Sequence, residues 1–257
     1  MPLALVRDDL AGTAAVSLRE EDGALVGEVS GADDVAAVAR QVARVMSLDH
    51  DGSGYPAVGA HDPVVARAMA AAPGLRPVLF HTPYEAAVWA ILSQRTAMAQ
   101  AASVRHRLGE RFGQRLVLAG RELQAFPLPE ELLAAPELPG VPAVKAAWLR
   151  GIAEAALEGR LDADRLRALQ PDEARAELRT IAGIGPFSAD LILLRGCGTT
   201  DVLSQHEPRL RRIVAASYGI DPDDDEALVA VAEGWRPYRT WVSVLLRATA
   251  GFPDRER

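Results

Sequence analysis

The spacing of apolar residues divides the chain into a short segment with strand character and a long one with helical periodicity. Residues 13–29 read TAAVSLRE, EDG and ALVGEV, two partly alternating stretches around a turn, which predict a β-hairpin. Apolar residues within 35–46 recur at helical spacing, which predicts a helix capped by Asp33 or Asp34. A loop containing Gly and Pro follows at 50–56. We therefore predict a small N-terminal domain at 1–58, made of the hairpin and its helix.

Helical signals dominate the remainder, and we predict no strand beyond residue 60. The sequence TPYE at 82–85 is typical of a helix start, with a capping Thr followed by a Pro in the first turn. Further helices are predicted at about 97–112, 130–135, 142–158, 172–181, 186–195, 208–217, 225–233 and 238–249. The predicted fold class is therefore mainly α, with an all-α domain of many short helices at 59–257 after a small α+β appendage.

Composition changes this picture mainly by exclusion. A chain of 257 residues with 49% hydrophobic content can bury one substantial core. Charged residues or Gly interrupt every apolar run well before the roughly 20 residues of a membrane span, so we expect no membrane association. The first ten residues lack a basic segment followed by an apolar one, so we expect a cytoplasmic location. Cys197 is the single cysteine, which excludes an internal disulfide, a Cys-rich zinc site and a four-Cys iron–sulfur cluster.

The net charge hides a local excess of basic residues. A value of −7 argues mildly against a nucleic-acid partner, because Lys and Arg supply much of the affinity for phosphate. Residues 175–215, however, hold six Arg and four acidic residues, and acids gather instead at 221–226 and in the first third of the chain. One face of an acidic protein can therefore be basic.

A Gly-Ile-Gly turn joins two predicted helices at 183–185. Each Gly permits a positive φ and a close approach of the backbone, which a phosphate needs if main-chain N–H groups are to hold it. Pro186 stands where the next helix begins, so the free N–H groups of that helix would face the same anion. A plain turn between two helices is the alternative interpretation. The longer pattern LRTIAGIGPFSADLILLRG at 178–196 favours phosphate binding, with Ile184 buried between the helices.

Several segments, in order, carry a resemblance to a known family. They are GLRPVLFHTPYEAAVWAILSQ at 74–94, AALEGRL at 155–161, the hairpin at 178–196, DVLSQHEPRLRR at 201–212 and WRPYRTW at 235–241. Residues from about 76 to 250 resemble the helix-hairpin-helix DNA glycosylase superfamily, and within it the bacterial 3-methyladenine DNA glycosylase II (AlkA) family. That resemblance implies a β-rich N-terminal domain, here shortened, and DNA contacts at Gly183, Ile184, Gly185 and Ser188.

The resemblance also bears on cofactors and metal ions. It implies that the reaction needs no cofactor. It implies a structural monovalent cation, Na⁺ or K⁺, at the hairpin, held by the backbone carbonyls of Arg179, Ile181 and Ile184. Carbonyl ligation leaves no side-chain signature, so this site comes from the resemblance alone.

The catalytic position departs from the family pattern. Breaking an N-glycosidic bond builds positive charge on the sugar, which a carboxylate stabilises. The family uses an Asp, and the matching residue here is Glu207, with one more methylene. Glu207 is either a working catalyst on a shifted backbone, a relic, or a solvated acid in the first turn of a helix. Asp201 and His206 are weaker candidates for the catalytic role. Asp201 also fits a capping or loop residue, and a single His is more often structural or solvated than catalytic.

The residues that match the family's base pocket also differ. Phe187 stands where the family has Trp, Leu191 and Pro208 where it has Tyr, and Arg247 where it has another Trp. Phe187 also fits a core position, because it repeats with Leu191 at helical spacing. An Arg at 247 would repel a cationic base, so a neutral, bulky or oxidised base, or another alkylated adduct, becomes conceivable. Strand-cutting members carry a Lys at the position of Phe187, so the resemblance implies a monofunctional enzyme.

The family inserts an apolar wedge into the duplex directly after a Gln. Gln94 is kept here, and the wedge position is Arg95. Arg can intercalate and contact phosphate, and a surface Arg with no partner is the alternative.

Two hypotheses follow for the whole chain. The first is a monofunctional DNA glycosylase of base-excision repair that acts on a damaged base in double-stranded DNA, with Glu207 assisting hydrolysis. The second is a DNA-binding or lesion-sensing protein of the same fold that has lost excision. A helical scaffold for a protein partner is a weaker third. For either DNA-binding protein we expect a monomer that associates with the bacterial nucleoid.

Overall fold

A computed structural model describes residues 2–250 of the chain. Its N-terminal part is a three-stranded antiparallel sheet in the order β1-β2-β3, covered by helix α1. The bounds are β1 Pro2–Val6, β2 Thr13–Glu21, β3 Ala24–Ser30 and α1 Val35–Val45. Strands β2 and β3 form the predicted hairpin. Of the two candidate caps, Asp34 is the one that accepts a hydrogen bond, from the N–H of Ala37 at 2.9 Å.

Eight helical segments form the first half of the helical region around one apolar core. They are α4 Pro83–Ser93, α5 Met98–Phe112, α6 Pro129–Ala134, α7 Ala143–Leu157, α8 Ala163–Ala168, α9 Pro171–Leu178, α10 Pro186–Leu191 and the π-helical turn η1 Ile192–Cys197. The buried side chains of this core include Ile91, Leu149 and Ile192. Helix α10 runs directly into η1, so the hairpin opens a continuous helical run to Cys197, which is buried.

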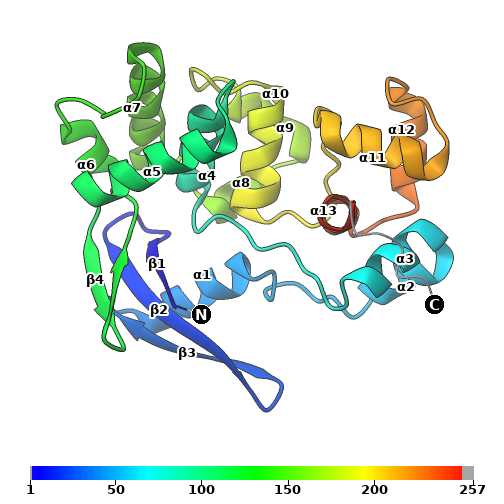
Figure 1. Cartoon of the computed structure of the whole chain (residues 1–257), viewed down its shortest axis with the longest axis horizontal. Coiled ribbons are helices and arrows are strands. Elements are labelled where there is room, and N and C mark those ends of the chain that lie inside the picture. The colour runs from blue at the N-terminus through cyan, green and yellow to red at the C-terminus, as the bar shows by residue number, and fades with distance from the viewer. Residues whose placement is uncertain (1, 251–257) are drawn as a thin grey trace.

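The second half combines helices from distant parts of the chain. Helices α2 Tyr55–His61 and α3 Pro63–Ala71 share a core with α11 Pro208–Tyr218, α12 Asp225–Glu233 and α13 Arg239–Thr249, centred on Trp235 and Trp241. We did not predict α2 or α3, and the predicted domain boundary after residue 58 falls inside α2. The chain crosses between the halves twice, at 72–82 and 198–207 (Figure 1).

The structure corrects one further expectation. A second hairpin, β4 Arg115–Leu118 and β5 Arg121–Gln124, lies in the region where we predicted only helices, and it packs beside the N-terminal sheet. Its turn residues Ala119 and Gly120 both have positive φ, of 50° and 73°. The mainly α fold class is confirmed. Within residues 2–250, every helix is too short or too polar to cross a membrane.

Candidate nucleic-acid interface and catalytic carboxylate

The first glycine of the predicted phosphate-binding turn is required by the fold. Gly183 has φ +87°, a conformation that side chains disfavour. A Cβ added there would lie 2.7 Å from Cδ2 of Trp148 and 2.8 Å from Cδ1 of Ile91. Backbone conformation and packing therefore both demand glycine at this position.

The second glycine meets a different requirement. Gly185 has φ −92° and ψ −177°, an extended backbone open to any residue, so only Gly183 uses the positive φ that we expected of both. A Cβ on Gly185 would meet no described atom within 4 Å. The fold leaves open space beside this backbone, which would let a molecule from outside approach it.

The start of α10 offers free backbone donors. The N–H groups of Gly185, Phe187 and Ser188 have no acceptor among the described residues. This is the usual state of a helix start, and it suits an anion. Ile184 differs from expectation, because its N–H donates to the carbonyl of Ile181 at 3.1 Å and is not free. The side chain of Ile184 is buried between the helices, as expected. The side chain of Ser188 is buried too, so Ser188 offers a ligand mainly its backbone N–H.

The same turn contains the three carbonyls expected to hold a monovalent cation. The carbonyl oxygen of Ile181 accepts one hydrogen bond and keeps a second lone pair, so the donor set is compatible with such an ion. Side-chain ligation is a separate matter: residues 2–250 contain no group of three His, Cys, Asp or Glu placed to hold a metal. The cation site at Arg179, Ile181 and Ile184 stays a prediction.

The predicted wedge lies against the predicted phosphate-binding turn. Gln94 ends α4, and its side-chain Nε2 donates to the carbonyl of Gly183 at 2.8 Å. Arg95 follows with φ +49°, and its exposed side chain has no hydrogen bond or ion pair with the described residues. The structure thus brings together two motifs that lie 89 residues apart.

Glu207 is a buried acid at the start of α11. The residue is 8% exposed, which rules out the solvated-acid interpretation. Its Oε2 lies 3.1 Å from Nε of Arg247, on α13. Nε of Arg247 makes no aligned hydrogen bond, so the contact is an ion pair. Arg195, on η1, lies near Arg247. Burial lowers the pKa of Arg195, and the positive charge of Arg247 lowers it further. We predicted Arg247 as a pocket residue and did not foresee its pairing with Glu207.

An acid that sequence reasoning missed anchors the loop before Glu207. Asp190 on α10 is 1% exposed and accepts from Nε of Arg175 at 2.7 Å and from Oγ of Ser204 at 3.0 Å. Its Oδ2 also lies 3.4 Å from Nδ1 of His206. The same Arg175 donates from Nη2 to the carbonyl of Leu203 at 3.0 Å. A charged residue inside an apolar helix was the available signal.

The other candidate acid is engaged elsewhere. Asp201 pairs with Nη1 of Arg236 at 2.7 Å and with Nε of Arg239 at 2.8 Å, at the start of α13. It therefore serves as a loop anchor in the structure. His206 is half exposed and contacts Asp190, which likewise places it in the support of the loop.

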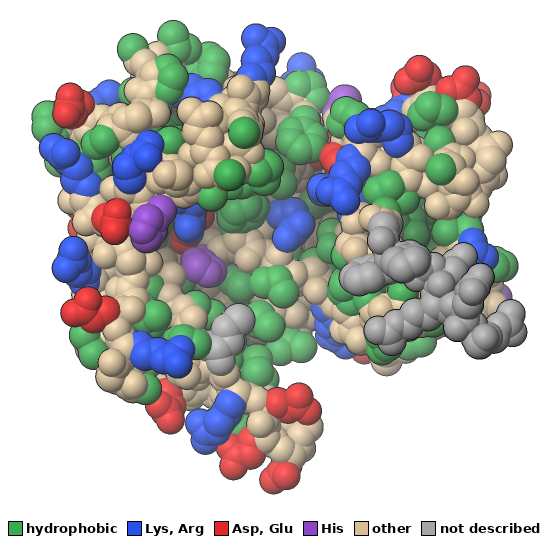
Figure 2. Space-filling view, in the orientation of Figure 1, with side chains coloured by type: hydrophobic (Ala, Val, Ile, Leu, Met, Phe, Trp, Pro, Cys, Tyr) green, Lys and Arg blue, Asp and Glu red, His purple; other side chains and the backbone are tan. Residues whose placement is uncertain are grey.

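The residues predicted for the base pocket come from three helices, with Phe187 and Leu191 on α10, Pro208 on α11 and Arg247 on α13. Phe187 is 43% exposed on α10, so the core interpretation fails for this side chain. Leu191 is half-buried one turn later, and Pro208 is exposed at the start of α11. Figure 2 shows the surface hollowed between the two halves, with basic side chains gathered over α11 at its edge.

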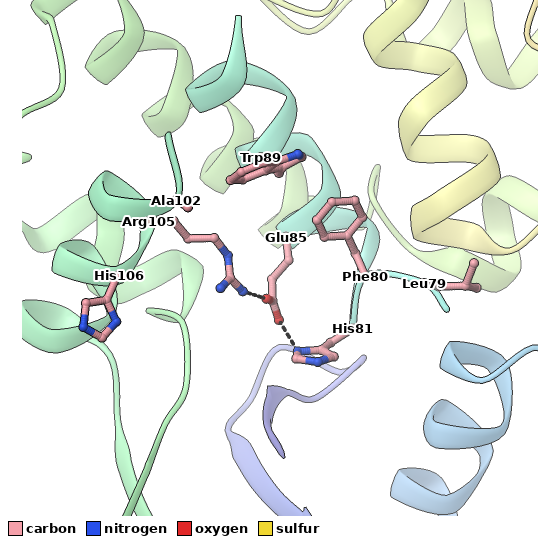
Figure 3. A pocket seen from close by; sticks show the side chains of 8 residues that line it. All are labelled: Leu79, Phe80, His81, Glu85, Trp89, Ala102, Arg105 and His106. Carbon is pink, nitrogen blue, oxygen red and sulfur yellow. Dashed lines mark hydrogen bonds and ion pairs between the residues drawn. The ribbon is translucent and has the colours of Figure 1, made fainter. Parts of the chain in front are cut away.

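A separate cavity of about 500 Å³ opens between α4 and α5 (Figure 3). The fully buried carboxylate of Glu85 contacts Nη2 of Arg105 at 2.5 Å and Nδ1 of His81 at 3.3 Å. Phe80 and Trp89 line the same cavity, with ring centroids 6.5 Å apart. Burial alone would raise the pKa of Glu85, but the pairs with His81 and Arg105 outweigh it and lower that pKa to about 2. Thr82 caps α4 as predicted, through the N–H of Glu85.

Comparison with known proteins places this geometry in a family. The chain is 31% identical to DNA-3-methyladenine glycosylase 2 of Escherichia coli over 195 residues, which cover 74% of the chain and 66% of that relative, just under two thirds of its length. No family model matches the chain. The chain belongs to the helix-hairpin-helix DNA glycosylase superfamily.

Solved structures of the superfamily share the fold. A 3-methyladenine DNA-glycosylase from Archaeoglobus fulgidus has a TM-score of 0.82 at 23% identity, with 98% of this chain and 87% of that chain covered. An 8-oxoguanine glycosylase/lyase from Clostridium acetobutylicum, in complex with double-stranded DNA, has a TM-score of 0.71 at 16% identity. The match covers 93% of this chain and 85% of that chain. The glycosylase fold thus extends over nearly all of the described chain.

Proposed function

We propose that the chain is a monofunctional DNA glycosylase that hydrolyses the N-glycosidic bond of a damaged base flipped out of double-stranded DNA. One observation carries the proposal: Glu207 is a buried carboxylate, and the loop that leads to it is held by Asp190 on α10, the helix that starts at the predicted phosphate-binding turn. Phosphate held at that turn would set the register of the duplex without reading its sequence. The family relationship supports DNA as the partner and excision as the reaction.

The chemistry follows from the charge that develops on the sugar. As the C1′–N bond breaks, the sugar becomes an oxocarbenium-like cation, and the negative charge of Glu207 would stabilise it. Water then forms the C1′–O bond, and its proton leaves with the base or through the carboxylate. Phe187 occupies the position of the family's Schiff-base Lys, so no covalent step to the protein is proposed.

Arg247 favours a neutral leaving base. A guanidinium beside the carboxylate would repel a base that already carries positive charge, such as 3-methyladenine. It would instead donate a hydrogen bond to an acceptor on a neutral base and stabilise the negative charge that develops there on departure. We therefore propose an alkylated, deaminated or oxidised neutral base as the substrate class, with Phe187 as its stacking surface.

A second candidate function is favoured by the same ion pair. Arg247 already neutralises much of the charge of Glu207 at 3.1 Å, which would leave less of it for the sugar. The chain would then bind and sense lesions without excision. Both functions require the phosphate-binding turn, so DNA binding alone does not separate them.

Excision assays on a panel of duplexes separate the two. Each duplex carries one lesion, cationic or neutral, and abasic product is revealed by cleavage with alkali. We expect product from at least one neutral lesion and little from 3-methyladenine. Arg247→Met should reduce this preference by about tenfold, since one hydrogen bond to a charged group is typically worth about 1.5 kcal/mol. An absence of product across the whole panel, with DNA binding intact, would leave the sensing function.

The remaining proposals concern the setting of the enzyme. We propose that it acts in the cytoplasm, on the nucleoid, as a monomer. A structural Na⁺ or K⁺ at the hairpin would brace the turn through the carbonyls of Arg179, Ile181 and Ile184, without a part in bond cleavage. Its exchange for Li⁺ should then alter DNA affinity and leave the rate of excision by bound enzyme unchanged.

A further inference from the structure

One lysine on α7 uses all of its hydrogen-bonding capacity on the predicted wedge turn. Nζ of Lys145 donates to the carbonyl of Gln94 at 2.7 Å, to Oγ1 of Thr96 at 3.0 Å and to the carbonyl of Leu92 at 3.1 Å. An ammonium group has three N–H donors, so each is engaged inside the protein. Lys145 is therefore not free to bind a DNA phosphate.

These bonds hold a strained peptide. Arg95 adopts φ +49°, which a side chain with a Cβ disfavours and which the surroundings must maintain. The carbonyl of Gln94 belongs to the peptide that precedes Arg95, and Thr96 follows it. Lys145 thus binds the backbone directly before Arg95 and the side chain of the residue directly after it, which restricts the direction in which the side chain of Arg95 leaves the turn.

Packing contributes little to the same turn. A cavity of about 530 Å³ lies between it and the start of α7, lined by residues that include Arg95, Thr96, Gly140 and Trp148. Because the cavity leaves few atoms in contact with the turn from that side, hydrogen bonds mainly determine the conformation of the turn.

The turn is also connected to the phosphate-binding turn. The side-chain amide of Gln94 donates to the carbonyl of Gly183, and the ring of Trp148, on the same helix as Lys145, packs against Gly183. Helix α7 thus contacts both turns and sets the distance between them.

We propose that Lys145 is a positioning residue for base flipping, which holds the turn at 94–96 so that Arg95 enters the duplex in fixed register with the phosphate-binding turn. The proposal rests on the proposed function for its role in flipping. Its structural half, that Lys145 orders the wedge turn, stands on the hydrogen bonds alone.

The structural half is tested without DNA. Lys145→Met keeps the length of the side chain and removes its donors, and Arg107→Met removes an exposed cation of α5 as a matched control. Hydrogen–deuterium exchange of the peptide at 93–97 should speed up by about tenfold in Lys145→Met and stay unchanged in Arg107→Met, because the clamp is lost only in the first. Unchanged exchange in Lys145→Met would overturn the proposal.

The flipping half is tested on a lesion duplex containing 2-aminopurine beside the target base. Lys145→Met should lower the fluorescence increase that reports flipping, by about tenfold in the flipping equilibrium, while the salt dependence of DNA affinity keeps its slope. A slope reduced by about 0.9, the value of one lost phosphate contact, would make Lys145 a phosphate ligand and overturn the proposal.

A double-mutant cycle separates positioning from general destabilisation. If Lys145 acts through Arg95, then Lys145→Met combined with Arg95→Ala should flip bases no worse than Arg95→Ala alone. Additive losses would contradict the proposal. If the wild-type protein itself neither flips nor excises, the proposed function fails, while the exchange experiment still decides whether Lys145 orders the turn.

Discussion

Gly183 and Gly185 belong to one short motif but meet different structural requirements. Gly183 is fixed by its positive φ and by the rings and methyl groups around it, whereas Gly185 has an ordinary backbone and open space beside it. The sequence predicted the turn between the two helices, since the motif is local, and the phosphate expected at it stays a prediction. It did not separate the two glycines, because the neighbours of Gly183 come from α4 and α7.

Alanine at each glycine should therefore have a distinct effect. Gly183→Ala should lower the free energy of unfolding by about 2–4 kcal/mol, through backbone strain and overlap with Trp148. Gly185→Ala should leave stability within about 0.5 kcal/mol and weaken DNA binding by about tenfold, because its methyl group would occupy the space of a phosphate. Urea denaturation and fluorescence anisotropy measure the two quantities. Equal DNA affinity for Gly185→Ala and wild type would contradict a phosphate at this turn.

Glu207 shows a similar division between what is local and what is not. The resemblance of DVLSQHEPRLRR to a family motif located the acid at residue level. Its partner Arg247 comes from another helix 40 positions later, and nothing in the local sequence indicates that the two side chains meet.

At the scale of elements, the loop between η1 and α11 carries the catalytic candidate and is held by hydrogen bonds from a neighbouring helix. Asp190 and Arg175 bind three of its residues, Leu203, Ser204 and His206. Because the loop has no regular structure of its own, these bonds define the place of Glu207 relative to α10.

The two acids that share Arg175 provide a matched test. Asp190→Asn should cost about 3 kcal/mol of stability, since it breaks a buried pair, and should slow excision by at least about tenfold while DNA affinity changes little. Asp172 also pairs with Arg175, at 2.8 Å, but is 94% exposed, so Asp172→Asn should cost less than about 0.5 kcal/mol and leave excision unchanged. Single-turnover kinetics and urea denaturation give the comparison. Equal rates for the two variants would remove Asp190 from the support of Glu207.

The elements that escaped prediction share a physical cause. Helices α2 and α3 are short, and each has a Pro in its first turn. Pro56 of α2 belongs to the stretch at 50–56 that we predicted as a loop. The β4–β5 hairpin has strands of only four residues and places Ala119 at a positive φ, where Asn, Asp or Gly would have marked the turn. Longer helices with clear periodicity, such as α5 and α7, were located to within a residue or two.

At the scale of the whole molecule, two helical halves meet at the site, and each half has its own core. The second half takes α2 and α3 from the N-terminal side and α11–α13 from the C-terminal side. Sequence periodicity alone carries no record of this exchange, because it reports each helix and not its partner. The stability of the first half depends in part on Glu85, which is buried on α4.

Glu85 should give the stability of the chain a measurable pH dependence. The folded pKa of about 2 lies below the ordinary glutamate pKa of 4.5, so the stabilisation is fully present above about pH 4.5 and is lost as the pH falls toward 2. A difference of that size corresponds to about 3 kcal/mol. Glu85→Gln should thus be less stable than wild type by about this amount at pH 7, and the gap should narrow below about pH 4.5. Urea denaturation from pH 7 to pH 3 measures it, and a gap constant with pH would contradict the ion-pair account.

The proposed excision depends on the action of Glu207 on the sugar. Its most direct test is the single-turnover rate of excision by Glu207→Gln on the best neutral lesion, with enzyme in excess, beside the affinity of the same variant for a duplex with an abasic analogue. We expect a rate at least about a hundredfold below wild type, with affinity changed by less than about threefold. An excision rate equal to that of wild type would contradict it.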